Sequence, residues 1–348
     1  MSKKITLQGI AQALHLSTAT VSRALNNKGR VSDAVRQQVF QKARELGYIS
    51  NLAGFPLTHR NKSMKIMIIY PAKDYFWTDV EIYRTNGHNL PQQIQIFEDL
   101  LLRDDINGVS FVPSDLTQLD YYVNAFFLKG VTVATFNIDA PLSKRHFFVG
   151  QNTYQSGKVA GELFLKSLKE RTKGDILVLS GSKKAPSHVT RWQGLIDYVH
   201  ENKVSLDVSQ VYEAKDDEEA YALTIRMMEL NHHLVGIFLT TALGNAGVGR
   251  AVTDVGKRDV VVIGNDISTE WSAYVEKGII DYCLYQEPFL QGYLSLRVLA
   301  DFLLFGLEPR KKIIYLPIIP LFKECYTESY VGLGEMLVEK LSLYHGLS

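Results

Sequence analysis

The sequence predicts a small all-α module at the N-terminus, followed by a larger α/β domain with mainly parallel sheets. Two observations indicate this division. Residues 1–62 contain ten Lys and Arg but only two acidic residues, a charge of +8, whereas the whole 348-residue chain has a net charge of +1, so the remainder carries −7. From residue 65 onward, short apolar segments alternate with segments of helical periodicity, which is the pattern of proteins with parallel sheets.

We assign residues 1–50 to the first module, 51–63 to a linker and 64–348 to the larger domain. The composition, 46% hydrophobic and 22% charged, is typical of a globular protein. The first nine residues lack the apolar core of a secretory signal, and no apolar run reaches the roughly 20 residues that span a bilayer, so we expect a cytoplasmic protein with no membrane partner. Cys283 and Cys325 lack metal-ligand spacing, and we expect neither a disulfide nor a metal site.

Three short segments of the first module have apolar residues at helical spacing. Thr6 is placed to cap the first helix, Ser17 the second and Ser32 the third, which ends at Gly47. Only residues 15–16 remain for the turn between the first two helices. The sequence therefore predicts three helices that share one small core.

The second helix has an exposed face made of small side chains and one long one. Small side chains let the backbone of this helix approach another molecule closely, and they occur at Thr18, Ala19 and Ser22. The long side chain of Arg23 projects from among them. The major groove of DNA favours such a helix, because hydroxyls bind phosphates and base edges, a methyl contacts thymine, and a guanidinium binds guanine with two hydrogen bonds. The alternative is a solvent-exposed Ser/Thr-rich helix in an unrelated three-helix bundle.

The stretches "TLQGIAQALHLSTATVSRALNN" and "VSDAVRQQVFQKARELGYISN" resemble the helix-turn-helix headpiece of the LacI/GalR family of bacterial transcription regulators. The resemblance implies a repressor that binds a pseudo-palindromic operator as a dimer, with phosphate contacts for position and base contacts for specificity. It implies base contacts from Thr18, Ala19 and Arg23. It implies phosphate or other DNA contacts from Thr6, Leu7, Ser17, Thr20, Ser22, Asn26, Arg30, Ser32, Asn51 and Leu57.

The linker departs from the family pattern. Family members have a short hinge helix there that inserts a Leu into the minor groove, and Leu57 occupies that position. Gly54 and Pro56 disfavour a helix, because Gly costs about 1 kcal/mol and Pro about 3 kcal/mol in a helix interior. Two interpretations stay open: a hinge helix that begins late, or a flexible linker that ends in the basic "HRNK" patch.

Polar side chains follow several predicted strands of the larger domain. Asn137 and Asp139 follow "VATF", Asp266 follows "VVVIGN" and Gln286 follows "YCLY". The carboxyl ends of strands are where open α/β sheets bind ligands. These segments resemble the two-lobed type I periplasmic sugar-binding fold that forms the effector domain of the same family, over residues 64–325. The resemblance implies a ligand site formed by Asp74, Phe76, Trp77, Asn137, Asp139, Arg191, Asn245, Asp266 and Gln286, where Asn245 lies in "TTALGNAGVG" in place of the family's "AND".

The first crossover of this domain is unusually short. Only residues 72–79 separate Pro71 from the next predicted strand, "VEIYR", whereas a parallel crossover needs a dozen or more residues. We therefore expect the first crossover helix to be missing, which leaves an uncovered sheet face, an antiparallel pair or a partner in its place. The tail after residue 326 is too short for a coiled-coil tetramerisation segment, so we expect a homodimer.

These observations predict a repressor in which two lobes close around a small sugar, polyol or sugar phosphate, without a cofactor, and which is associated with the nucleoid when bound to DNA. One alternative is a DNA-bound regulator with a degenerate effector pocket that responds to a protein partner. A remote alternative is a sugar-processing enzyme, but G-x-S-x-G, HExxH and G-x-x-x-x-G-K-[ST] motifs are all absent, so we expect no catalytic residues. The identity of the effector, and whether it acts as inducer or corepressor, stay open.

Overall fold

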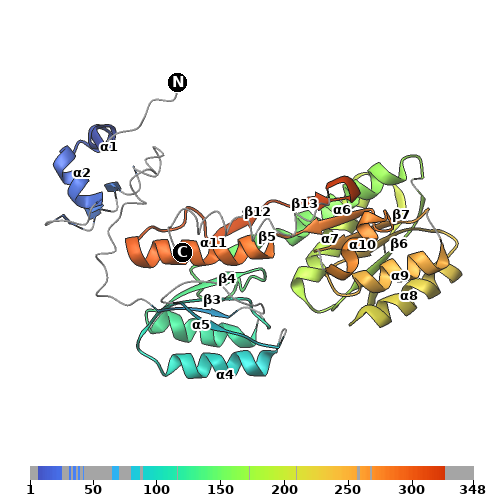
Figure 1. Ribbon diagram of the computed structural model, residues 1–348, viewed down its shortest axis with the longest axis horizontal. Helices are drawn as coiled ribbons and strands as arrows, with labels where there is room; N and C mark the ends of the chain where they lie inside the picture. Colours follow the sequence, from blue (N-terminus) through green and yellow to red (C-terminus); the bar gives the residue numbers. More distant parts are fainter. Residues whose placement is uncertain are drawn as a thin grey trace. The chain divides into compact units, whose positions relative to one another are not determined.

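The protein is described by a computed structural model (Figure 1) over residues 7–25, 31–32, 34–36, 38–39, 42, 65–69, 80–86, 89–115, 117–171, 173–208, 210–256, 259–266 and 269–325. The chain forms two compact units. Unit 1 comprises Met1–Val149 and Gly292–Ile314, and unit 2 comprises Gly150–Gln291 and Tyr315–Ser348. The chain therefore passes from one unit to the other three times.

The N-terminal module contains the predicted helices. α1 spans Leu7–Leu14, α2 spans Thr18–Leu25, and residues 34–36, 38–39 and 42 are also helical. Their apolar faces form one small core of Ile10, Ala11, Val21, Ala24 and Val39. All five are among the apolar residues at helical spacing in the sequence, so the spacing correctly predicts the buried face at these positions.

The sheet of unit 1 has six strands in the order β12-β5-β4-β3-β1-β2, and the pairs from β2 to β5 are parallel. Its strands are β1 (Lys65–Ile69), β2 (Val80–Tyr83), β3 (Ile106–Phe111), β4 (Thr132–Phe136), β5 (Phe147–Gln151) and β12 (Ile313–Leu316). Helices α4 (Leu90–Leu101) and α5 (Gln118–Leu128) cover one face, and α11 (Pro288–Phe305) covers the other (Figure 1). Strands β5 and β12 were not predicted from the sequence.

Alternate residues of β3 bind the two helix layers. Val109 and Phe111 pack in the core on the α4 and α5 side, where the Phe97 and Phe111 rings meet edge to face at 4.9 Å. On the opposite face, a Cβ at Gly108 would lie 2.9 Å from Leu303 of α11, so glycine permits this close packing. The sheet of unit 1 is therefore buried on both faces along β3.

Helix α11 has 18 residues and a mean hydropathy of 1.2, so among the described residues it is the one helix long and apolar enough to cross a membrane. The fold buries 17% of this helix. Gln291, Ser295 and Leu299, spaced four residues apart, are fully buried, and the Ser295 hydroxyl lies 2.7 Å from that of Ser110 in β3. Helix α11 therefore contacts β3 through one narrow face.

Strand β2 lies beside β1 in parallel, with Ile66 opposite Val80. The predicted strand is confirmed, and the antiparallel alternative is wrong. Residues 70–79, which connect the two strands, lie outside the described part of the chain. Ten extended residues reach about 33–36 Å, whereas a five-residue strand is only about 17 Å long. The connection is therefore long enough to return to the start of a parallel strand without a crossover helix.

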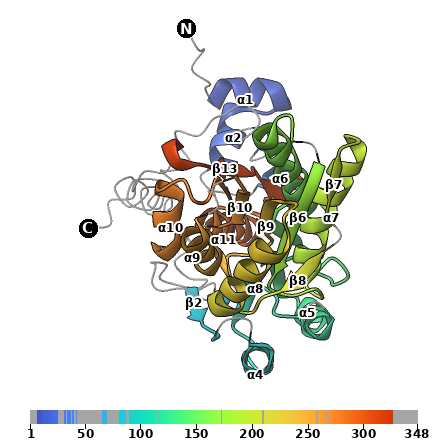
Figure 2. The same ribbon diagram turned by 90° about the vertical axis from the view of Figure 1, so that its right-hand side faces the viewer.

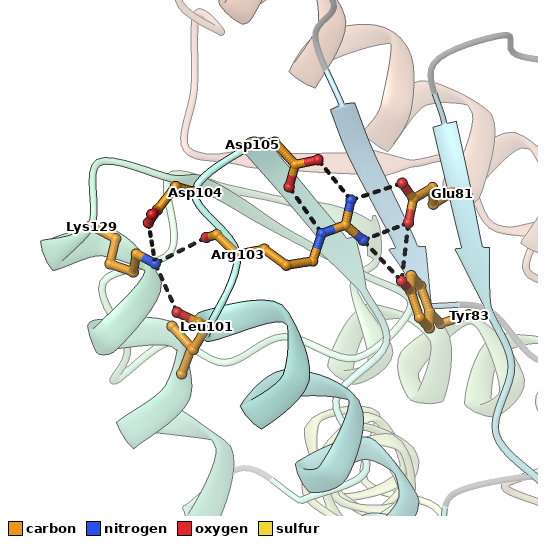
Figure 3. A network of polar contacts seen from close by, with 7 residues as sticks. All are labelled: Glu81, Tyr83, Leu101, Arg103, Asp104, Asp105 and Lys129. Carbon is orange, nitrogen blue, oxygen red and sulfur yellow. Dashed lines mark hydrogen bonds and ion pairs between the residues drawn. The ribbon is translucent and has the colours of Figure 1, made fainter.

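An ion-pair network ties the edge strand β2 to the turn before β3 (Figure 3). The Arg103 guanidinium donates to both carboxylate oxygens of Glu81, at 2.6 and 2.9 Å, and to both oxygens of Asp105, at 2.9 and 3.0 Å. The Tyr83 hydroxyl donates to Glu81 at 3.0 Å. Bidentate geometry of this kind makes charge-assisted hydrogen bonds strong and directional.

Lys129 extends the network to the end of α4 (Figure 3). Its ammonium group donates to the carbonyl oxygens of Leu101 and Arg103, at 2.7 and 2.9 Å, and to the Asp104 carboxylate at 3.1 Å. Carbonyls at a helix C-terminus lack intrahelical donors and carry partial negative charge, so a cation stabilises them. The network therefore joins β2, α4 and α5.

Unit 2 contains a sheet in the order β13-β11-β10-β9-β6-β7, with β8 also paired to β6. The pairs are parallel except for the antiparallel pair of β11 and β13. Its strands are β6 (Lys173–Ser180), β7 (Ser205–Asp207), β8 (Val211–Glu213), β9 (Leu234–Leu239), β10 (Val261–Asn265), β11 (Tyr282–Tyr285) and β13 (Ile319–Leu321). Strands β6, β9, β10 and β11 coincide with the strands that the apolar segments "GDILVLSG", "LVGIFLTT", "RDVVVIGND" and "IDYCLYQ" predict, whereas β7, β8 and β13 were not predicted.

Helices lie on both faces of this sheet (Figure 2). They are α6 (Thr153–Leu168), α7 (Pro186–Glu201), α8 (Asp217–Leu230), α9 (Asn245–Val255) and α10 (Thr269–Glu276), and a 3-10 turn at Lys323–Cys325 follows β13. In β6, Ile176 and Val178 pack in one core with α6 and α7, and Leu177 and Leu179 pack in the other core with α8 and α9. Such parallel strands are buried on both faces, which explains their continuous apolar sequences. Cys283 and Cys325 are free thiols, as expected.

His146 in unit 1 accepts a hydrogen bond that requires a neutral ring. The backbone N–H of Val133 donates to His146 Nδ1 at 3.0 Å, and the ring lies beside Phe127 and Phe302. Burial, together with the charge of Lys312, lowers the pKa of His146 below its usual value. A proton on Nδ1 would abolish the bond from Val133.

We expect Arg103→Met to lower the free energy of unfolding by about 1–2 kcal/mol, because it removes charge-assisted hydrogen bonds that hold β2. Urea titration of the full chain measures the change. The control is Lys166→Met, which breaks the exposed pair with Glu162 within α6 and should change stability by less than about 0.5 kcal/mol. Equal effects of the two substitutions would contradict a role for Arg103 in fixing the edge strand.

We expect His146 to make the protein less stable at acidic pH. Its folded-state pKa lies below the unfolded value of about 6.5, so the neutral ring contributes stability above that pH, and this contribution is lost as the pH falls below it. Melting temperatures at pH 7.5 and 5.5 measure the effect. His146→Asn keeps an acceptor near the Nδ1 position and does not titrate, so it should lose less stability than the wild type over this interval.

Candidate functional site

The exposed face of α2 consists of the side chains that the sequence predicts for a groove-binding helix. Thr18, Ala19 and Arg23 are exposed, whereas Val21 and Ala24 are fully buried in the core of the module. This face is a surface of short side chains with one long guanidinium. The small core therefore leaves the predicted base-reading residues accessible.

The turn between α1 and α2 is tight. His15 has a left-handed φ of 53°, and the Leu16 N–H still bonds the Ala11 carbonyl oxygen at 2.9 Å. The two helices therefore meet within two residues, as the sequence predicts.

Ser17 caps α2, as predicted. Its hydroxyl accepts the backbone N–H of Thr20 at 3.0 Å and lies 2.8 Å from the Thr20 hydroxyl. Arg23 Nε donates to the Ala19 carbonyl oxygen at 3.2 Å, so the base of the guanidinium lies against its own helix. The Ser32 hydroxyl accepts the Val35 N–H at 3.4 Å at the start of the third helix.

The other predicted DNA contacts divide into two groups. Leu7, Thr20 and Ser22 are half-buried, and Ser17 and Ser32 are exposed beside the first turns of the helices that they cap. The remaining predicted residues lie outside the described part of the chain: Thr6, Asn26, Arg30, Asn51 and Leu57.

In unit 2, three of the predicted ligand residues form one connected cluster, which we call the strand-end cluster: Arg191, Asp266 and Gln286, together with the backbone of Thr240. Thr240, Asp266 and Gln286 immediately follow β9, β10 and β11. Because these strands are parallel neighbours, their carboxyl ends meet at one edge of the sheet. Arg191 reaches this edge from the second turn of α7.

Gln286 links the two charged groups of the strand-end cluster. One terminal nitrogen of Arg191 donates to the Thr240 carbonyl oxygen, and the other donates to Gln286 Oε1 at 3.0 Å. The amide nitrogen of Gln286 donates to Asp266 Oδ2 at 2.6 Å, and its backbone N–H donates to Asp266 Oδ1 at 3.2 Å. The guanidinium and carboxylate are thus connected through one amide.

Burial controls the electrostatics of the strand-end cluster. It lowers the pKa of Arg191 to about 10, with the Asp266 charge opposing the shift, so the guanidinium is charged at neutral pH. Burial also raises the pKa of Asp266, against the effects of Arg191 and Gln286. Arg191 is only 2% exposed, and its Nε–H has no hydrogen-bond partner among the described residues. A buried donor without a partner is costly, so this Nε–H is an unused hydrogen-bond donor of the strand-end cluster.

Two asparagines that support the cluster have structural partners. Asn245, predicted as a ligand residue, is 1% exposed at the start of α9 and donates to the Asn265 carbonyl oxygen at 2.9 Å. Asn265, which was not predicted, donates from its amide to the Leu239 carbonyl oxygen. The structure therefore uses both amides to join the ends of β9, β10 and α9. The signal for Asn265 was its position directly before Asp266.

In unit 1, the two predicted residues after β4 have different surroundings. Asp139 forms a bidentate ion pair with Arg145, which was not predicted from the sequence, and accepts the Thr135 hydroxyl at 3.3 Å. Asn137 has a left-handed φ of 63°, a conformation that Asn tolerates better than most residues. The remaining predicted ligand residues lie outside the described part of the chain: Asp74, Phe76 and Trp77.

Within the described ranges, no group of three or more His, Cys, Asp or Glu side chains is arranged to hold a metal ion. The strand-end cluster instead presents a cation, a carboxylate and amide groups. These groups donate to and accept from hydroxyls, which suits a neutral polar ligand.

Comparison with known proteins matches both parts of the chain. Residues 69–307 match the family described as periplasmic binding protein domain, and residues 6–51 match the bacterial regulatory proteins of the lacI family.

Several repressors are similar in sequence. The chain is 24% identical over 281 residues to the ribose operon repressor of Halalkalibacterium halodurans, covering 75% of this chain and 80% of that protein. It is 21% identical over 278 residues to the transcriptional repressor PurR of Histophilus somni, covering 75% of this chain and 82% of that protein. It is 34% identical over 125 residues to the transcriptional repressor CytR of Escherichia coli, covering 32% and 36%.

Solved structures with the same fold include sugar-binding proteins. An ABC transporter solute binding protein from Burkholderia graminis in complex with D-arabinose has a TM-score of 0.68 at 20% identity and covers 77% of this chain and 98% of that one. A sugar-binding protein of a sugar ABC transporter from Bacillus halodurans has a TM-score of 0.67 at 22% identity and covers 75% and 98%. At these identities the likeness shows the fold alone.

Proposed function

The chain belongs to the periplasmic binding protein domain family and carries a lacI-family DNA-binding domain at its N-terminus, and we propose that it is a transcription repressor that binds a pseudo-palindromic operator as a dimer and responds to a small sugar or polyol. The observation that carries this proposal is the exposed face of α2, which presents Thr18, Ala19 and Arg23, while the opposite face of the helix packs in the core of the module. The similar proteins named above are repressors and binding proteins rather than enzymes.

DNA recognition is proposed for α2 and the residues around it. The charge of +8 on residues 1–62 favours phosphates. The short side chains of Thr18 and Ala19 would let the backbone of α2 approach base edges. Arg23 would release its hydrogen bond to the Ala19 carbonyl oxygen and donate to a guanine instead. Two modules in a dimer would bind half-sites about one helical turn apart. We place this activity in the cytoplasm, on the nucleoid.

Effector binding is proposed for the strand-end cluster. The unpartnered Nε–H of Arg191 and the carboxylate of Asp266 would bind adjacent hydroxyls of one ligand, while Gln286 keeps the two charges apart. A sugar or polyol fits this donor and acceptor set, and a sugar phosphate is the variant that the exposed Lys183 and Lys184 would favour. The sequence similarity to a ribose operon repressor over 75% of this chain supports the class of ligand.

A protein partner is the second candidate for the effector. It is favoured by the short connection of residues 70–79 between β1 and β2, which has fewer residues than a usual helical crossover. In that case the chain would still bind operator DNA, but sugars would not stabilise it. Thermal unfolding distinguishes the two candidates, because a bound ligand raises the melting temperature by mass action.

We expect Arg23→Ala to weaken operator binding by about 1–3 kcal/mol and to relax the preference at one base pair in each half-site. Binding is measured by fluorescence anisotropy with the selected operator and with variants at each position. The control is Arg226→Ala at an exposed position in unit 2, which should leave operator affinity unchanged. A uniform loss on all sequences would instead make Arg23 a phosphate contact.

We expect Asp266→Asn to abolish stabilisation by sugars and to leave operator affinity in the absence of sugar unchanged, because the amide keeps a partner for Gln286 but removes the charge. The melting temperature is measured with D-ribose, D-arabinose and myo-inositol. The control is Asp216→Asn, which keeps an equally good cap on α8. A sugar that stabilises Asp266→Asn as strongly as the wild type would contradict the proposed site.

A further inference from the structure

Helices α6 and α7 touch through their backbones at two glycines. A Cβ at Gly157 of α6 would overlap the carbonyl oxygen of Arg191, and a Cβ at Gly194 of α7 would overlap the carbonyl oxygen of Tyr154. Each glycine therefore faces the backbone of the opposite helix, and both are buried. Backbone cannot rotate away as a side chain can, so any larger residue at either position forces the helices to move relative to each other.

Polar contacts on both sides of the glycines hold the helices in register. The hydroxyls of Thr153 and Thr190 lie 2.6 Å apart, and the Tyr154 hydroxyl donates to Asp197 at 2.8 Å. The Lys158 ammonium group, in the second turn of α6, donates to both carboxylate oxygens of Glu201 at the end of α7, at 2.7 and 2.8 Å. These contacts restrict sliding of α7 along α6, because each joins a fixed pair of positions.

The residue against which Gly157 packs is the one that supplies the cation of the strand-end cluster. The Arg191 side chain is almost fully buried, and both its terminal nitrogens are bound, to Thr240 and Gln286. The location of the Arg191 guanidinium therefore depends on the position of the Arg191 backbone. Hydrogen bonds weaken steeply when the donor and acceptor separate or lose alignment, so a movement of about 1 Å at residue 191 would disturb both bonds.

We propose that Gly157, with its counterpart Gly194, is a positioning residue for Arg191: the backbone contact between α6 and α7 sets the location of the guanidinium and hence the affinity of the strand-end cluster for its ligand. The link to affinity rests on the proposed function of the cluster, whereas the positioning of Arg191 does not. Neither glycine contacts the ligand in this proposal.

Gly161 offers a matched control on the same helix. A Cβ at Gly161 would lie 2.7 Å from Cδ1 and 2.9 Å from Cβ and Cγ of Tyr198, so it meets a side chain of α7 and not its backbone carbonyls. Gly157→Ala and Gly161→Ala add the same methyl group to α6 one turn apart, and both gain helix propensity. The first methyl overlaps the Arg191 carbonyl oxygen itself, whereas the second meets Tyr198, seven residues further along α7, at 2.7 Å or more. A purely structural role for the glycines would give both variants similar effects on Arg191.

The test uses the full chain and two readouts. The first is the Nε–H resonance of Arg191 in two-dimensional ¹H–¹⁵N spectra without ligand, assigned by its absence in Arg191→Lys. We expect Gly157→Ala to shift this resonance or to accelerate its exchange with solvent, and Gly161→Ala to leave it in place. The second is the affinity for whichever of D-ribose, D-arabinose and myo-inositol stabilises the wild type, which Gly157→Ala should weaken at least tenfold and Gly161→Ala less than threefold.

The two readouts separate the failure of this proposal from the failure of the proposed function. If none of the three sugars binds the wild type, the proposed effector class fails, and the Arg191 resonance alone decides the positioning role. An unchanged resonance in folded Gly157→Ala, or an equal shift in Gly161→Ala, overturns the proposal. If Gly157→Ala does not fold, Gly194→Ala is tested in the same way. If neither variant folds, the exchange of the Arg191 Nε–H with solvent is measured in the wild type. Rapid exchange overturns the positioning proposal, and slow exchange supports it.

Discussion

The buried guanidinium of Arg191 constrains the structure of unit 2 more than any other group that we describe. A charge removed from water is costly unless hydrogen bonds compensate it, and here the compensation comes from the Thr240 carbonyl and the Gln286 amide. These acceptors lie at the ends of β9 and β11, whereas the arginine lies on α7. These two hydrogen bonds therefore fix the position of α7 relative to this edge of the sheet. Asp266 in turn is held by Gln286, so the charged groups, the strand ends and the helix are fixed together.

The N-terminal module orients one helix with few residues. Its core is small, so the tight turn, the Ser17 cap and the packing of Val21 and Ala24 must together orient α2. Because these contacts use one side of the helix, the other side is free to present its short side chains and Arg23. The charge is likewise divided along the chain: residues 1–62 carry a net charge of +8, and the remaining residues are acidic overall. Repulsion of DNA by the acidic domain would favour contact through the module alone.

Unit 1 shows how an edge strand is held when its connection is short. Strand β2 pairs with β1 in parallel, and Arg103 binds Glu81 of β2 with both of its terminal nitrogens (Figure 3). The same guanidinium binds Asp105 at the start of β3. Ion pairs between partly exposed groups are weak singly, but this geometry combines several charge-assisted bonds on one arginine. The network therefore couples the edge strand to the centre of the sheet.

Signals that are local along the chain were sufficient to predict the helices of the N-terminal module with their buried faces, and the strands β1 to β4, β6 and β9 to β11. Helical spacing in the N-terminal module identified Val21 as core, and continuous apolar strands identified the ends at which Asp266 and Gln286 lie. The partners of these residues came only from the packing of separate elements, as in the ion pair of Asp139 with Arg145 and in the backbone contact between α6 and α7. Spacing along the chain carries no information about such contacts, because they depend on distances between elements that the complete fold brings together.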